Sequence, residues 1–97
     1  MFVVTGAYQV KPGTRDDFLK EVYDQGIYAE FLKEEGNISY DYYYPYRNET
    51  DIFFVERWET PEAWDAHKVA PHTARLQPIK DKYMTGFVPG FFGEIKE

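Results

Sequence analysis

The stretch FVERWETPEAWDAH, residues 54–67, places a carboxylate, two indoles and an imidazole close together in the chain. Its first half alternates like a β-strand, so Glu56 shares one face with Phe54 and Trp58. Burial of a carboxylate among aromatic rings raises its pKa, because burial disfavours the charged form. Glu56 is therefore a candidate proton acceptor, or a group that orients a neighbouring base. An ion pair with an Arg or Lys, with a purely structural role, is the alternative.

The second half of the stretch has the pattern of a capped helix. Thr60 is a typical N-cap and Pro61 a typical first helical residue. His67 then falls about two turns into the helix, on a face next to that of Trp64. An imidazole titrates near neutrality, so His67 is a second candidate for accepting a proton or for hydrogen bonding to a substrate oxygen. A buried histidine with structurally satisfied nitrogens is the alternative.

Four further side chains could bind a substrate. Tyr40 and Trp58 are natural stacking walls for a planar ring, although core packing is the ordinary role of both residue types. Trp64 and His72 are the other two candidates, and Trp64 could equally anchor the core or an interface. His67 and His72 do not lie on one helix face, the chain has no cysteine, and its carboxylates are scattered. The sequence therefore predicts no metal site.

Composition restricts the classes of partner. Aromatic residues make up 20% of the chain, with nine Tyr, eight Phe and two Trp, which favours an aromatic pocket, a buried subunit face, or both. The net charge of −6 argues against nucleic acid and anionic membranes. The segment 1–10 reads as a first strand rather than a signal peptide, and no run is long enough to span a bilayer. We expect a soluble, cytoplasmic protein.

Hydrophobic periodicity and turn residues predict one domain over 1–97. The expected elements are a strand over 2–10, a helix between the N-cap Thr14 and the C′ residue Gly36 with an interruption at Gly26, strands over 37–46 and 51–59, helices over 61–69 and 72–84 with a bend at Pro78, and a strand over 86–95. The order β-α-β-β-α-β is the ferredoxin-like split βαβ pattern of an α+β protein with an antiparallel sheet. Helices would cover one face of the sheet, and a second copy is the simplest cover for the other, so we predict a homodimer.

Three motifs resemble the antibiotic biosynthesis monooxygenase family, which includes quinol monooxygenases. They are Val10-Lys11-Pro12-Gly13 with Phe18, the entry Glu35-Gly36-Asn37-Ile38-Ser39-Tyr40 to the second strand, and Phe54–Glu59 leading through Pro61-Glu62-Ala63 to His67 and His72. The resemblance covers nearly the whole chain. It implies a dimeric α/β-barrel in which His67 matches the helix histidine of the family.

Members of this family oxidise phenolic or quinol compounds with molecular oxygen, without a metal or flavin. The resemblance therefore implies a cofactor-independent monooxygenase that acts on a quinol-like or polyphenolic small molecule. A non-catalytic, dimeric small-molecule-binding or stress-associated protein on the same scaffold is the alternative. Haem binding or haem degradation fits less well: the related haem proteins use a first-strand Asn, a Trp and a His, whereas Gly6 and His67 stand near the first two positions and His72 near the third.

Overall fold

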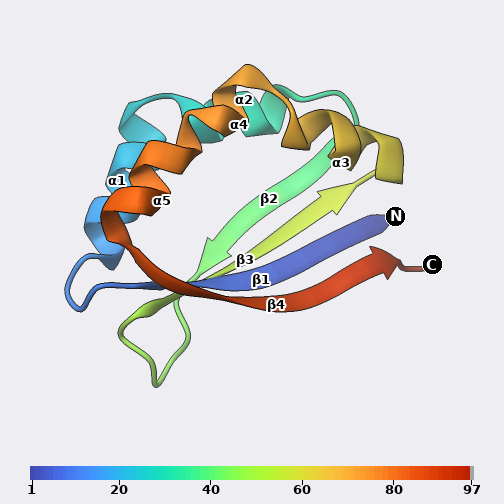
Figure 1. Cartoon of the computed structure of the whole chain (residues 1–97). Coiled ribbons are helices and arrows are strands. Elements are labelled where there is room, and N and C mark those ends of the chain that lie inside the picture. Colours follow the sequence, from blue (N-terminus) through green and yellow to red (C-terminus); the bar gives the residue numbers. More distant parts are fainter. Residues whose placement is uncertain (97) are drawn as a thin grey trace.

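The computed structural model describes residues 1–96, which form a four-stranded sheet with short helices on one side (Figure 1). In chain order the elements are β1 (Phe2–Val10), α1 (Arg15–Asp24), α2 (Ile27–Lys33), β2 (Asn37–Tyr43), β3 (Asp51–Trp58), α3 (Pro61–Lys68), α4 (Pro71–Ala74), α5 (Leu76–Tyr83) and β4 (Met84–Glu94). Within these residues no helix combines the length and apolar character needed to cross a membrane.

The strands lie in the order β2-β3-β1-β4, and every neighbouring pair is antiparallel. This is the ferredoxin-like α+β topology, so the predicted split βαβ order is confirmed. The register places Glu56 of β3 directly opposite Val4 of β1 and Tyr40 of β2. Because facing residues in adjacent strands share one side of the sheet, these three side chains all lie on the face that the helices cover.

The core is densest where α1 and α2 cover the sheet. Phe18 and Val22 of α1 and Ile27 and Phe31 of α2 are fully buried. Gly26 separates the two helices with a φ of 75°, a conformation that favours glycine. The break changes which residues of the second helix face the sheet. Ile27 and Phe31 therefore face inward, whereas Leu32, which a continuous helix would bury, is half exposed.

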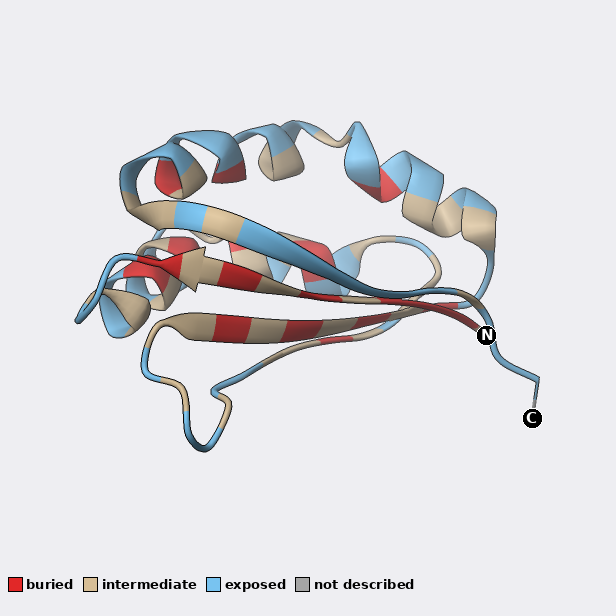
Figure 2. Cartoon of the chain, turned by 60° about the horizontal axis from the view of Figure 1, so that its bottom comes forward, coloured by how far each residue is buried: buried red, intermediate tan, exposed pale blue. Residues whose placement is uncertain are grey.

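Figure 2 shows that the helices leave the other face of the sheet free and that burial alternates along β3. This outer face carries apolar side chains, because Ala7 of β1 lies opposite Phe53 of β3 and Val88 of β4. Tyr43 and Val88 are about half exposed there. Exposed apolar faces of this kind are typical of interaction surfaces.

Several boundary predictions were wrong. The strand β2 ends at Tyr43 rather than at 46, because Pro45 lacks the N–H that would continue the ladder. The hydroxyl of Thr14 donates to the Lys11 carbonyl (2.6 Å) and caps no helix N–H. Thr60 does cap, as expected, by accepting from the Ala63 N–H at 3.1 Å.

The helix ends also differ from expectation. The helix α2 ends at Lys33 with Glu34 as its C-cap, so Gly36 is not the C′ residue; it lies in the following turn with a φ of 82°. The predicted helix over 72–84 is divided at Arg75 into α4 and α5. Pro78 causes no bend there, because it lies in the first turn of α5, where a helix needs no N–H donor.

Candidate functional site

A cavity of about 680 Å³, partly open to solvent, lies between the covered face of the sheet and the helices α3, α4 and α5. The strands contribute aromatic walls from Tyr8, Tyr40 and Phe54, and the helices contribute Trp64 and His67. The cavity also has a charged part, made by Glu56, Lys68 and Lys80. An aromatic-lined hollow with a few polar groups is the ordinary form of a small-molecule site.

Glu56 is the buried acid of this cavity. Its side chain reaches into the cavity from β3, and its Oε1 accepts a hydrogen bond from the Trp58 indole N–H at 3.2 Å. The residue is only 5% exposed, and this burial raises the pKa of its carboxyl to about 7, partly offset by the Trp58 hydrogen bond and the charge of Lys80. A carboxyl with this pKa exchanges a proton at neutral pH.

The His67 ring, from α3, lies between Glu56 in the cavity and Glu34 at the end of α2. Its Nε2 lies 3.6 Å from Oε1 of Glu56, and its Nδ1 lies 2.7 Å from Oε2 of Glu34. The ring centroid is 4.9 Å from that of Trp58. Burial lowers the pKa of His67, although the neighbouring Glu34 acts in the opposite direction. In its neutral form the imidazole has both a donor and an acceptor nitrogen.

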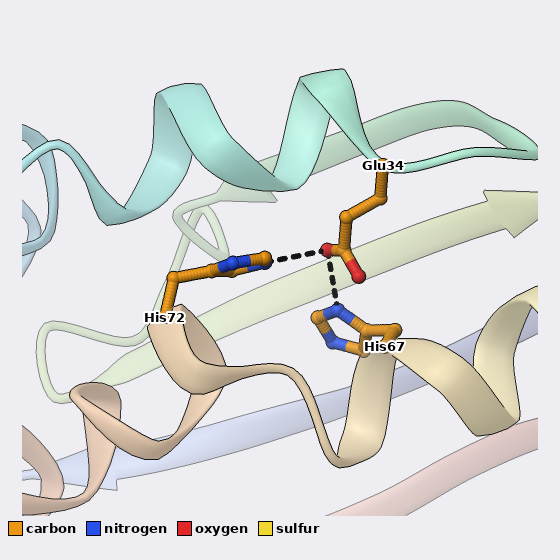
Figure 3. A group of neighbouring side chains, drawn as sticks. All are labelled: Glu34, His67 and His72. Carbon is orange, nitrogen blue, oxygen red and sulfur yellow. Dashed lines mark hydrogen bonds and ion pairs between the residues drawn. The ribbon is translucent and has the colours of Figure 1, made fainter.

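On the side of His67 away from Glu56, a second cluster contains Glu34 and His72 (Figure 3). Nε2 of His72 lies 3.1 Å from Oε2 of Glu34, the same oxygen that contacts His67. The three residues each offer one ligand atom, and these atoms lie within 4.8 Å of one another. Sequence reasoning missed this cluster because the two histidines do not share one helix face, the chain has no cysteine, and its carboxylates are scattered along the sequence. Glu34 comes from the C-cap of α2, and His72 from α4.

The predicted site residues divide into two groups. Tyr40 and Trp64 line the cavity together with Glu56 and His67. Trp58 and His72 do not line it, and Trp58 packs in the core, the alternative that the sequence left open for it. Trp58 is fully buried, and its indole N–H donates a hydrogen bond to the Glu56 carboxylate.

His72 is held away from the cavity by its own packing. It lies against Phe31 of α2, with ring centroids 5.7 Å apart, and faces Glu34. It belongs to the second cluster and is not among the residues that line the cavity. Pro71 is the local cause, because it starts the separate short helix that carries His72.

Sequence reasoning also missed Tyr8 and Lys80 as cavity residues. Tyr8 is buried, and desolvation raises the pKa of its hydroxyl far above the ordinary value. Nζ of Lys80 lies 5.1 Å from the centroid of the Tyr8 ring, and burial lowers the pKa of this lysine. The parity of Tyr8 with Val4 in the first strand was the signal for its inward direction, whereas nothing in the sequence singled out Lys80.

The sequence of residues 1–78 matches the family model described as antibiotic biosynthesis monooxygenase. The chain belongs to this family. A search of curated proteins found no match.

Solved structures of similar fold come from both bacteria and an archaeon. A provisionally assigned antibiotic biosynthesis monooxygenase from Nitrosomonas europaea is 21% identical with a TM-score of 0.82, over 99% of this chain and 100% of that one. A protein from Mycobacterium tuberculosis is 21% identical with a TM-score of 0.80, over 99% and 96% of the two chains. A conserved protein from Methanosarcina mazei is 23% identical with a TM-score of 0.81, over 96% and 92%. These likenesses show a shared fold.

Proposed function

We propose that this protein is a cofactor-independent monooxygenase that oxidises a quinol-like or polyphenolic small molecule with molecular oxygen. The observation that carries the proposal is a buried carboxyl, Glu56, with a pKa of about 7, inside an aromatic-lined cavity and 3.6 Å from His67. Membership of the antibiotic biosynthesis monooxygenase family supports it.

This reaction requires the protein to provide a proton acceptor and a binding surface for a planar ring. Loss of a phenolic proton to Glu56 leaves an electron-rich phenolate, which can pass electrons to oxygen. For a hydroquinone the overall reaction inserts one oxygen atom into a ring C–H and releases the other as water, giving a hydroxyquinone. All four electrons that reduce the oxygen molecule come from the substrate, so no external reductant is required.

The cavity residues fit separate roles in this scheme. Tyr40 and Trp64 provide aromatic surface for the substrate ring. Nε2 of His67 faces Glu56 and can hydrogen bond to the oxygen that loses its proton. Lys80 supplies the positive charge that offsets an anionic substrate, since it lines the same cavity and interacts with Glu56.

We also propose a homodimer formed through the outer face of the sheet. The apolar side chains on that face include Phe53 and Val55 of β3, together with the half-exposed Tyr43 and Val88. A self-complementary contact between two such sheets would cover them, as isologous interfaces do. This arrangement is the dimeric α/β-barrel that the family resemblance implies.

Oxygen uptake with a menadiol-type quinol tests the activity. We expect the wild-type protein to consume oxygen above the rate of spontaneous oxidation, and Glu56→Gln to lower kcat by about 10²- to 10⁴-fold, the usual contribution of a positioned base. Glu59→Gln is the matched control, because Glu59 is an exposed acid just beyond the end of the same strand. In protein treated with EDTA, the wild-type rate should rise as the pH passes about 7, where Glu56 loses its proton.

Equal rates for Glu56→Gln and the wild type would contradict the role of Glu56. Saturable binding of the quinol with no oxygen uptake would instead indicate the non-catalytic small-molecule-binding protein. Binding can be followed through tryptophan fluorescence, since Trp64 lines the cavity.

A further inference from the structure

The cluster next to His67 contains both histidines of the chain and one glutamate. The sequence contains two histidines and no cysteine, and both histidines lie against Glu34. The three groups come from separate helices, α2, α3 and α4, so their convergence is produced by tertiary structure (Figure 3).

The distances are close to those of a metal coordination shell. A tetrahedral Zn²⁺ with ligands at about 2.0–2.1 Å places neighbouring ligand atoms about 3.3 Å apart. Here Oε2 of Glu34 lies 2.7 Å from Nδ1 of His67 and 3.1 Å from Nε2 of His72. All three atoms lie within 4.8 Å of one another. A cation bound by all three atoms requires the side chains to readjust, because the two contacts of Glu34 are shorter than this spacing.

Two features show that hydrogen bonding alone leaves this cluster unsatisfied. Nε2 of His72 is buried and has no hydrogen-bond partner in the described structure, even though it lies 3.1 Å from the carboxylate. Glu34 also stands at the C-terminal end of α2, where the helix dipole disfavours negative charge. A cation between the three groups would satisfy both the nitrogen and the carboxylate.

We propose that Glu34, His67 and His72 form a binding site for a divalent transition-metal ion of the Zn²⁺ type. The ligand atoms are Nδ1 of His67, Nε2 of His72 and a carboxylate oxygen of Glu34, and a water molecule takes the fourth position. Two imidazoles and one carboxylate suit zinc and its neighbours, whereas Mg²⁺ and Ca²⁺ prefer shells made of oxygen.

The proposed metal site is separate from the substrate cavity. His67 and Thr73 line the cavity, but Glu34 and His72 do not. The cation would sit on the helix side of the His67 ring and connect α2, α3 and α4. The proposal therefore does not depend on the monooxygenase activity, and its test uses no activity measurement.

Calorimetric titration of the EDTA-treated full-length protein with Zn²⁺ tests the site. We expect saturable binding of one ion per chain and no binding of Mg²⁺. Glu34→Gln and His72→Gln should each weaken Zn²⁺ binding more than about tenfold, since loss of even a second-shell partner of a metal ligand costs that much. Glu35→Gln is the matched control, because Glu35 is the adjacent, exposed acid. It should bind as the wild type does.

Two measurements on the wild-type protein keep the test decisive if a variant fails to fold. With only two histidines, a long-range ¹H–¹⁵N spectrum contains two imidazole systems. Zn²⁺ should shift Nδ1 of one ring, His67, and Nε2 of the other, His72. It should also raise Tm by about 10–20 °C at one hundred times the dissociation constant. Absence of saturable binding, or binding that Glu34→Gln and His72→Gln leave unchanged, would overturn the proposal.

Discussion

The helices that cover the sheet form two groups: the first layer, α1 and α2, and the second layer, α3, α4 and α5. The two groups differ in which residues they bury. The helices α1 and α2 bring Phe18, Val22, Ile27 and Phe31 against the sheet, and all four side chains are fully buried. The helix α3 buries only His67, and α4 buries no residue. The first layer therefore completes the core, whereas the second stands over the sheet and leaves a cavity beneath it.

This contrast arises from residue types more than from backbone. Both layers follow a strand and a threonine, and both are broken into short helices. In the first layer the inward positions carry large apolar side chains, which fill the space. In the second layer α5 buries Leu76 and Ile79, but α3 buries only the imidazole of His67 and α4 buries no residue, so space stays open beneath these two helices and keeps polar groups. A repeated βα unit thus supplies stability in one half and a site in the other.

The largest loss of stability should come from truncating a buried side chain of the first layer. Phe31→Ala removes a fully buried ring that stacks on Tyr40 at 4.5 Å, so we expect the free energy of unfolding to fall by about 3–5 kcal/mol. The comparison on the cavity side is Phe87→Ala in β4, a residue that lines the cavity and is 48% exposed. It should cost less than about 1 kcal/mol. Equal losses in urea denaturation would remove the distinction between the first layer and the cavity side.

A smaller effect, with the opposite sign, is expected at Glu56, the buried acid of the cavity. The pKa of Glu56 is raised from 4.5 to about 7 in the folded protein, so the fold favours the protonated form. The stability that this protonation contributes is present below pH 4.5 and is lost as the pH rises through about 7. We expect Glu56→Gln to be more stable than the wild type at pH 8 by about 3 kcal/mol.

The gain in Glu56→Gln should fall to less than about 1 kcal/mol at pH 5, where the wild-type carboxyl is protonated in the fold but partly ionised in the unfolded chain. Urea denaturation of EDTA-treated protein at both pH values measures it. Glu59→Gln serves again as the control, and it should show no such dependence on pH. A Glu56→Gln protein that is less stable than the wild type at pH 8 would mean that the charged form is the one that the cavity stabilises.

The smallest effect concerns how each layer begins. Thr60 caps α3 through the Ala63 N–H, so Thr60→Ala should lower the free energy of unfolding by about 1 kcal/mol. Thr14 stands at the same place before α1 but caps nothing, and Thr14→Ala should cost less than about half of that. Thermal unfolding of the two variants measures the difference. A larger loss at Thr14 would show that its bond to the Lys11 carbonyl matters more than a true cap.

The sequence predicted the fold well because its signals were local. Alternation over 2–10 and 51–59, and the Thr60-Pro61 helix start, depend on neighbouring residues alone, and the structure bears them out. The failures lay where one local signal competes with another. Thr14 is a good capping residue, but the nearby Lys11 carbonyl takes its hydroxyl.

The site was harder to predict because its members come from distant segments. Parity placed Glu56 on the covered face, and the structure agrees. Parity could not show that the indole of Trp58 turns back to hold that carboxylate. Glu34 was missed because its partners, His67 and His72, are more than thirty residues away. An acid at a helix C-terminus was the available signal, since that position normally favours a cation.

His67 contacts both the cavity and the Glu34–His72 cluster, so its ring can link the two. A neutral imidazole carries a single ring proton. When that proton lies on Nδ1 and is donated to Glu34, Nε2 accepts hydrogen bonds from the cavity; when a cation occupies Nδ1, the proton moves to Nε2, which then donates. Cation binding next to Glu34 would thus change the hydrogen-bonding character of Nε2 in the cavity. As an acceptor Nε2 favours a phenol, and as a donor it favours a phenolate.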